Sequence, residues 1–485
     1  MREAVRTPVC DFVRDYADRD PLRLHMPGHK GRGAMETLDI TEIQGAPPLY
    51  PASGILRESE ENAARLFGAK RTIYSAEGSS LCIRAMLFLA RMRAESLRIP
   101  PVILAGRNAH RTFLSAAALL DLEVKWLRGQ SVLTCLPAAE EAAEMLDGME
   151  KLPAAVYLTS PDYLGFRADI SGISAVCHAR GIPLLVDNAH GAYLRFLPED
   201  LHPLTQGADI CCDSAHKTLP ALTGAAYLHI HRDAPLLFQT QAERGMALFA
   251  STSPSWLVLQ SMDRCNAKLA EDWPERLKAF LPEVRKQKAK LTKKGFLFIG
   301  DEPLKWTIAA KAFGYTGNEL HDLLRESGIE CEFSDPDFLV MMLSPETGTE
   351  GLYRLMQALE SIPRREPIPE EAPPIPRAEE ALSLRRAILA PAETLPLAEC
   401  QGHILAEPCI SCPPAVPILI SGERIDTEAI RCFAYYGVKE LSCIREETDP
   451  ETEFIRNDEE RVTKDFAGSL KTEREGEING TDGNL

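Results

Sequence analysis

Short apolar segments alternate with helix-like segments between about residues 60 and 240, and this alternation restricts the fold more than any other feature. The apolar segments have strand-like composition and end in Gly, Pro or polar residues; they include PVILAG (101–106), AAVYLTS (154–160), IPLLVDNA (182–189), ADICCDS (208–214) and GAAYLHI (224–230). Amphipathic segments such as SSLCIRAMLFLARMRAE (79–95) and ISGISAVCHARG (170–181) have helical spacing. The pattern predicts an α/β fold with a mostly parallel sheet and helices on both of its faces.

Polar side chains stand at the ends of these predicted strands. In an open parallel sheet, ligands bind beyond the carboxyl ends of the strands. Ser160, Asp187, His190 and Ser214 occupy such positions in this sequence. We therefore expect the chemistry of the protein at this edge of the sheet.

The rest of the chain divides by composition into further regions. The predicted boundaries are an N-terminal arm rich in Gly and Pro (1–60), a large α/β domain (61–274), a small α+β domain (275–362), a proline-rich acidic linker (363–377), a C-terminal module (378–445) and an acidic disordered tail (446–485). Within the C-terminal module, AVPILIS (415–421) is a further strand candidate.

Charge and composition exclude several classes of protein. A net charge of −17 argues against a nucleic-acid partner, because such proteins need clustered Lys and Arg. No apolar run is long enough to span a membrane, and the charged N-terminus lacks the apolar core of a signal peptide. The 13 cysteines are scattered, several inside apolar runs, which favours free buried thiols in a reducing cytoplasm over disulfides.

Lys217 lies between two apolar segments, ADICC (208–212) and GAAYLHI (224–230), and is expected to sit deep in the protein. Burying an ammonium group without a partner is costly. A covalent bond to an aldehyde cofactor would remove the free amine and supply the partner. A structural lysine that pairs with a carboxylate, or one that reaches solvent, remains the alternative.

Three other features point to the same cofactor chemistry. Asp187 could pair with a pyridinium nitrogen, although it could also cap the following turn. Gly78, Ser79 and Ser80 precede an amphipathic helix and could bind a phosphate ester, although an ordinary N-cap has the same sequence. His110 follows a strand and could stack on an aromatic ring, or it could be a surface residue. Together with the lysine, these features supply what pyridoxal phosphate needs.

The sequence resembles the pyridoxal-phosphate-dependent Orn/Lys/Arg decarboxylases, which have the aspartate aminotransferase (type I) fold. The resemblance runs from about residue 7 to 440 and rests on these motifs: HMPGHKGRG, DITEIQG, LYPASGILRESE, GSS, RNAHRT, LTSPDYLG, VDNAHGAY, SAHKTLPALTGAAYLH and STSPSWLVLQSMD. After the linker, AEPCISCPPAVPILISGERI resembles the small C-terminal domain of the family. Because the chain begins at the glycine-rich arm, it resembles the short form without the N-terminal wing domain.

The resemblance implies a role for each matching residue. Lys217 would be the Schiff-base lysine, Asp187 would pair with the pyridine nitrogen, and His110 would stack on the ring. His190 would lie near the phenolic oxygen of the cofactor or the substrate carboxylate. The residues expected at the phosphate are Ser79, Ser80, Ser214 and His216. Thr252 and Ser253 would reach the phosphate of a partner subunit, which implies a homodimer or a higher homo-oligomer.

The implied reaction is the decarboxylation of arginine, lysine or ornithine to agmatine, cadaverine or putrescine, as part of polyamine metabolism. Lys217 or His216 would donate the proton to the carbon that loses carbon dioxide. Asn188, Asp162 and Arg111 depart from the usual pattern of the family, and Asp162 bears on the pocket that reads the substrate. Glu423 is a candidate partner for the distal cation of the substrate, or a solvated turn residue.

Other interpretations remain open. A different pyridoxal-phosphate reaction on the same fold, such as transamination or another lyase reaction, is the alternative within enzymes. The alternative that is not an enzyme is an inactive paralogue that binds the cofactor. Cys409 and Cys412 have the spacing of half a zinc or redox site, but no matching pair exists in the sequence, so we expect no metal. For His25 and His29, the nearby glycines favour a tight backbone turn over metal ligation.

Overall fold

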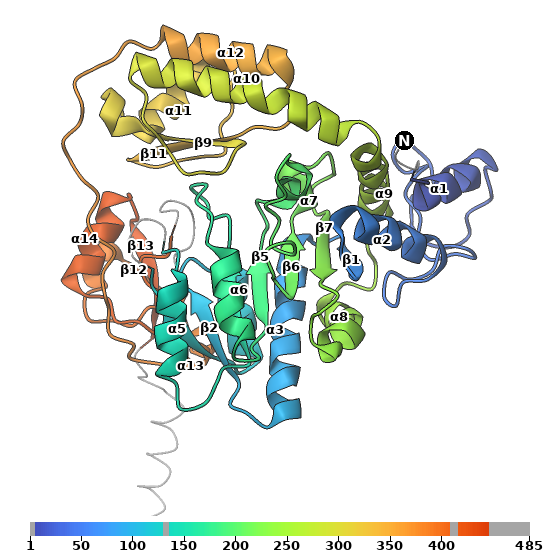
Figure 1. Cartoon of the computed structure of the whole chain (residues 1–485), viewed down its shortest axis with the longest axis horizontal. Helices are drawn as coiled ribbons and strands as arrows, with labels where there is room; N and C mark the ends of the chain where they lie inside the picture. The colour runs from blue at the N-terminus through green and yellow to red at the C-terminus, as the bar shows by residue number, and fades with distance from the viewer. Residues whose placement is uncertain (1–4, 130–134, 408–415, 446–485) are drawn as a thin grey trace, which may run out of the picture.

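A seven-stranded sheet forms the centre of the molecule (Figure 1). The computed structural model describes residues 5–129, 135–407 and 416–445. The strands are β1 (Arg71–Ser75), β2 (Val102–Gly106), β3 (Glu123–Leu127), β4 (Ala155–Thr159), β5 (Leu184–Asp187), β6 (Ile210–Asp213) and β7 (Ala226–Ile230), in the order β1-β7-β6-β5-β4-β2-β3. All pairs from β3 to β6 are parallel, whereas β7 runs antiparallel to both of its neighbours. The predicted mostly parallel sheet is confirmed.

Helices cover both faces of this sheet. They are α3 (Gly78–Leu97), α4 (Arg111–Leu119) and α8 (Leu236–Phe249) on one face, and α5 (Ala139–Asp147) and α6 (Ile170–His178) on the other. Strand β5 shows the consequence for sequence: Leu185 packs on the first face, while Leu184 and Val186 pack on the second. A strand that is buried on both faces has no polar side, which explains its continuous apolar sequence.

The edge strands β1 and β3 are not continuous apolar segments, and the apolar pattern did not predict them. Strand β1 is buried after Arg71, although it contains Thr72 and Ser75. Strand β3 alternates exposed and buried residues, and Glu123 and Lys125 face solvent. Its sequence, EVKWL, is therefore half polar, as expected of an edge strand.

The N-terminal arm packs beside the sheet. It contains α1 (Pro8–Asp18) and the beginning of α2 (Gly54–Phe67). Both helices contact α9 (Trp256–Ala270), so the arm is attached to the large domain through helix packing.

A second domain follows α10 (Trp273–Lys294). It has a four-stranded antiparallel sheet in the order β10-β11-β9-β8, built from β8 (Phe298–Ile299), β9 (Lys305–Ala309), β10 (Phe333–Ser334) and β11 (Phe338–Met342). Helices α11 (Gly317–Glu326) and α12 (Gly348–Ser361) belong to the same unit, and α12 packs along α10 (Figure 1). Residues 363–377 contain no helix or strand.

The C-terminal module comprises α13 (Leu384–Leu389), α14 (Thr427–Tyr435) and the antiparallel pair β12 (Ala392–Pro396) and β13 (Glu440–Ile444). The prediction of a strand at AVPILIS is wrong for the part that the structure describes, because residues 416–421 form bends and turns. Ile418, Leu419 and Ile420 are buried there, so the apolar run serves packing from an irregular segment. The predicted tail, 446–485, lies outside the described residues, as do Cys409 and Cys412. No helix in the described part has the length and apolar character needed to cross a membrane.

Candidate active site

A pocket of about 290 Å³ opens at the carboxyl ends of the parallel strands. Its size lies near the lower end of the range for small-molecule sites, roughly 300–1,000 Å³. The predicted residues that line it are Gly78, Ser79, Ser80, His110, Asp187, His190, Ser214, His216 and Lys217. The sheet therefore brings together residues that lie up to 139 positions apart (from Gly78 to Lys217) in the sequence.

Lys217 lies in the short helix α7 (Ala215–Thr218), directly after β6. Its Nζ atom is 3.0 Å from Nε2 of His190. The expectation of deep burial is wrong: the side chain is exposed, because it points into an open pocket. The protein that surrounds the pocket still removes water from the amine, and this desolvation lowers the pKa of Lys217, although Asp187 opposes the shift.

Asp187 ends β5 and is buried at the base of the pocket. Its carboxylate accepts hydrogen bonds from Oη of Tyr157 at 3.3 Å and from the backbone N–H of Ala189 at 3.1 Å. These contacts fix the direction of a carboxylate that also lines the pocket.

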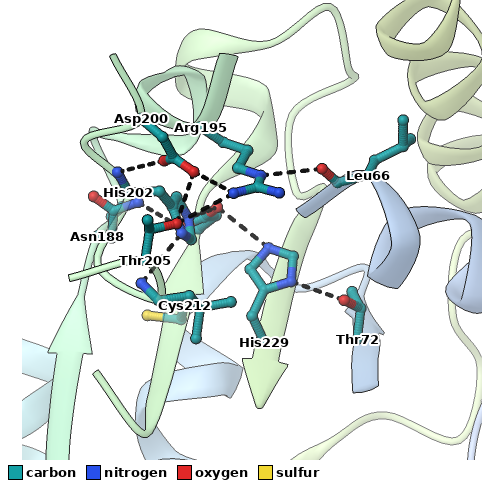
Figure 2. A network of polar contacts seen from close by, with 12 residues as sticks. Leu66, Thr72, Asn188, Arg195, Asp200, His202, Thr205, Cys212 and His229 are labelled. Carbon is teal, nitrogen blue, oxygen red and sulfur yellow. Dashed lines mark hydrogen bonds and ion pairs between the residues drawn. The ribbon is translucent and has the colours of Figure 1, made fainter. Parts of the chain in front are cut away.

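A buried polar network lies behind Asp187 (Figure 2). Asn188 donates from Nδ2 to Oδ1 of Asp213 at 2.7 Å, and Oδ2 of Asp213 lies 3.0 Å from Nε2 of His202 and 3.2 Å from Nε2 of His229. His229 continues the network to Oγ1 of Thr72 at 2.8 Å. Burial raises the pKa of Asp213, but the two histidines outweigh it and the net pKa is lowered. The ionised Asp213 thus anchors Asn188, the residue next to Asp187.

The other end of the pocket is suited to an anion. Gly78 begins α3 with φ +69° and has open space where a Cβ would stand. Oγ of Ser214 donates to Oγ of Ser79 at 2.9 Å, and Oγ of Ser80 accepts from Thr112 at 3.2 Å. The N-terminus of a 20-residue helix offers free N–H groups and the positive end of its dipole to a phosphate.

Two imidazoles are oriented by their local bonds. Nδ1 of His110 accepts from the backbone N–H of Thr112 at 3.2 Å and thereby caps α4, so Nε2 carries the proton of the neutral ring. Burial lowers the pKa of His110, which favours this neutral form. Nδ1 of His216 donates to the carbonyl oxygen of Ala225 at 3.0 Å, which fixes the second ring.

Thr252 and Ser253 do not line this pocket. Both are exposed in the segment between α8 and α9. The backbone N–H of the neighbouring Ser251 donates to Oε1 of Glu77 at 2.8 Å, close to the beginning of α3. A role across a subunit interface therefore stays a prediction.

Glu423 is also placed elsewhere, which corrects its expected position. Its carboxylate pairs with Arg107 at 2.9 Å, and both side chains are almost completely buried. It also accepts from the backbone N–H of Ile420 and lines a different cavity of about 420 Å³, between β3 and the C-terminal module. A carboxylate already neutralised by a guanidinium is a structural contact.

Three other predicted positions lie outside the pocket. Ser160 is buried, and its Oγ accepts from the backbone N–H of Ala168 at 3.0 Å. His25 and His29 make contacts within the arm, with Tyr16 at 3.0 Å and Asp39 at 3.1 Å.

Two further residues belong to the site: Asp162, which the sequence analysis connected with the substrate pocket, and Lys305, which it did not single out. Asp162 is buried and lines the pocket; its Oδ1 accepts from Phe166 at 2.8 Å, whereas Oδ2 has no hydrogen-bond partner among the described residues. Burial raises the pKa of Asp162 to about 7. Lys305, from β9 of the second domain, reaches Nδ1 of His190 at 3.4 Å. Lys305 is the first residue of β9, and the only signal in the sequence was a lysine at the beginning of a largely apolar strand.

These residues fit a flat aromatic aldehyde that carries a phosphate ester and a ring nitrogen. An amine, a fixed carboxylate, an imidazole and a helix N-terminus with two hydroxyls surround one pocket. Each has a matching group on such a ligand, and no metal-binding residue is needed.

The chain is similar to known proteins along most of its length. Residues 7–295 match the family model "Orn/Lys/Arg decarboxylase, major domain", and residues 371–442 match the C-terminal domain of the same family. The arginine decarboxylase of Bacillus subtilis is 28% identical over 87% of this chain and 92% of its own length. That of Bacillus cereus is 25% identical over 88% of this chain and 99% of its own length. The crystal structure of the Francisella novicida lysine decarboxylase superposes with a TM-score of 0.74 at 17% identity, covering 91% of this chain and 81% of that one, which supports the fold.

Proposed function

The chain belongs to the Orn/Lys/Arg decarboxylase family, and on that premise we propose that it decarboxylates a basic amino acid with pyridoxal phosphate attached to Lys217. One observation carries the proposal: Lys217, Asp187, His110 and the N-terminus of α3 converge on one pocket at the carboxyl ends of the sheet.

The residues of the chain have separate tasks in this reaction. Bound pyridoxal phosphate supplies an electron sink for the bond that breaks. Asp187 would hold a proton on the ring nitrogen by charge, and its fixed direction would cost no reorganisation during the reaction. Ser79, Ser214 and the N–H groups of α3 would bind the phosphate, and His110 would stack on the ring. Lys217 or His216 would donate the proton to the carbon that loses its carboxylate.

Arginine is the first substrate to test. Several relatives that share 25–28% identity along most of both chains are arginine decarboxylases, and the product of that reaction is agmatine, a polyamine precursor. Lysine and ornithine present the same α-amino acid group with a different distal cation. A location in the cytoplasm and a homodimer, with Thr252 and Ser253 near the phosphate of the partner, are part of the proposal.

Release of labelled carbon dioxide tests the reaction directly. The purified protein with added pyridoxal phosphate is incubated with carboxyl-labelled arginine, lysine or ornithine, with and without an α-keto acid. We expect label in the gas phase and the corresponding amine in solution, without need of the keto acid. Amino transfer to the keto acid with no gas released would favour the transaminase interpretation instead.

A further inference from the structure

His190 lies between two lysines, and the three groups cannot all hold their usual protons. Nε2 of His190 is 3.0 Å from Nζ of Lys217, and Nδ1 is 3.4 Å from Nζ of Lys305. A neutral imidazole has one N–H and one lone pair, whereas an ammonium group can only donate. Two ammonium groups therefore cannot both donate to this ring.

The surroundings of Lys305 show which lysine is charged. Lys305 and Glu302 form an ion pair at 2.9 Å with both side chains almost fully buried. Nζ of Lys305 also donates to the carbonyl oxygen of Asp162 at 3.1 Å. Glu302, this carbonyl oxygen and His190 thus surround the ammonium group. Oε1 of Glu302 is in turn held by Oη of Tyr193 at 3.3 Å, so the charge pair is fixed in place.

Proton counting then assigns the ring and the second lysine. Because Lys305 donates to Nδ1, the proton of neutral His190 is on Nε2. This N–H points at Nζ of Lys217, which must accept it with a lone pair. We propose that Lys305 is a positioning residue that, through His190, holds the Lys217 amine in its uncharged, nucleophilic form. The inference rests on the proposed function, because a free-base Lys217 matters only if it attaches the cofactor.

The charges that face these groups agree with the assignment. Burial, then Lys305 and Lys217, lowers the pKa of His190 well below its usual value, so a doubly protonated ring is disfavoured. His110 and His216 also face His190 and act in the same direction. Besides His190 and His110, the groups that act on the charge of Lys217 are Asp187, Glu332, Cys212 and Lys305. Desolvation outweighs the carboxylates and lowers the pKa of Lys217.

The test measures the charge state of Lys217 in the protein without cofactor. An amine-reactive label is applied over a range of pH, and mass spectrometry of the peptide that carries Lys217 gives the midpoint of its titration. The variant Lys305→Met with Glu302→Gln removes the ion pair without leaving a buried charge. We expect its Lys217 midpoint to rise by about one pH unit, which is a roughly tenfold slower labelling below the midpoint.

A double-mutant cycle separates the tautomer from simple charge repulsion. In a His190→Leu background, removal of the Lys305–Glu302 pair should leave the midpoint of Lys217 nearly unchanged. The matched control, Lys311→Met with Asp337→Asn, removes another ion pair of the second domain (3.0 Å) and should not move the midpoint. The variant Lys305→Arg keeps the positive charge and the hydrogen-bond donors. Its Lys217 midpoint should therefore lie closer to the wild-type value than that of the variant without the ion pair.

Either of two results would overturn the proposal: an unchanged midpoint after loss of Lys305, or an equal shift with and without His190. The labelling needs no cofactor, so its outcome is independent of the carbon dioxide assay. A failure of the proposed decarboxylation would appear in that assay even if Lys217 proves to be uncharged.

Discussion

At the scale of the residue, burial decides which groups of the pocket carry charge. Asp162 is the clearest case, because it lines the pocket and its buried Oδ2 has no hydrogen-bond partner among the described residues. The pKa of this carboxyl is raised from 3.8 to about 7 by desolvation. The folded protein therefore holds a proton that the unfolded chain has already lost at neutral pH.

This shift predicts a pH-dependent effect of Asp162→Asn on stability. Between pH 4 and 7 the unfolded chain loses the proton first, so the wild-type protein loses stability as the pH rises, and the loss is complete above pH 7. The Asn variant lacks this group. Its stability relative to wild type should rise by about 2 kcal/mol from pH 5 to pH 7, because the folded group is half deprotonated at pH 7. Urea denaturation at several pH values measures the difference, and a difference that does not vary with pH would refute the prediction.

The residue scale also shows what the sequence can reveal about the site. Three site residues stand at or just after the ends of predicted strands: Lys217, Asp187 and Ser214. Because ligands bind at the carboxyl ends of parallel strands, the sequence was enough to predict that these residues lie close together. Lys305 could not be found in this way, because it comes from another domain and the sequence does not state which domains meet. Glu423 was misplaced for the same reason, since its partner Arg107 is 316 positions away.

At the scale of the element, the pair Arg107–Glu423 joins the end of β2 to the C-terminal module. Arg107 directly follows β2, and its Nη2 also donates to the carbonyl oxygen of Ile418 at 3.3 Å. A charged group from the large domain thus holds the irregular segment 416–421 in place. Such a contact could not be predicted from the apolar sequence of the segment, which suggested a strand. Strands with a continuous apolar sequence were predictable, whereas the more polar edge strands β1 and β3 were not.

Glu423→Gln should therefore lower stability more than it changes the choice of substrate. It leaves Arg107 buried and unpaired, which costs about 3–5 kcal/mol in comparable cases. Glu379→Gln is the matched control, because Glu379 pairs with Arg424 on the surface, and its loss should cost at most about 1 kcal/mol. The double variant Arg107→Met with Glu423→Leu should recover part of the loss. A stable Glu423→Gln variant with altered discrimination among arginine, lysine and ornithine would restore the substrate-binding interpretation.

At the scale of the whole molecule, the site is proposed to be complete only in an assembly of two chains. Thr252 and Ser253 are exposed and lie outside the pocket of their own chain, in a segment tied to Glu77 near α3. The fold of a single chain accounts for the sheet, the pocket and the residues expected to bind the ring. It does not place Thr252 and Ser253 in contact with the pocket. Sequence motifs suggested their task, and the fold of one chain does not test it.

Mixing two inactive variants tests this shared site. Lys217→Ala removes the attachment point, and Thr252→Trp blocks the segment expected to reach the partner. In a mixed dimer, one of the two sites receives a wild-type copy of both residues. After subunit exchange of equal amounts, activity should recover to about a quarter of the wild-type level. No recovery, with exchange verified by mass spectrometry of differently tagged chains, would show that each chain builds its site alone.

The central claim is that the cofactor is joined to Lys217, and one measurement tests it most directly. The protein loaded with pyridoxal phosphate is reduced with borohydride, digested, and its modified lysine is identified by mass spectrometry. We expect a single pyridoxyl group on the peptide that contains Lys217, and none in Lys217→Ala, whose visible absorbance and turnover should also be lost. Modification of a different lysine, or full activity in Lys217→Ala, would contradict the account.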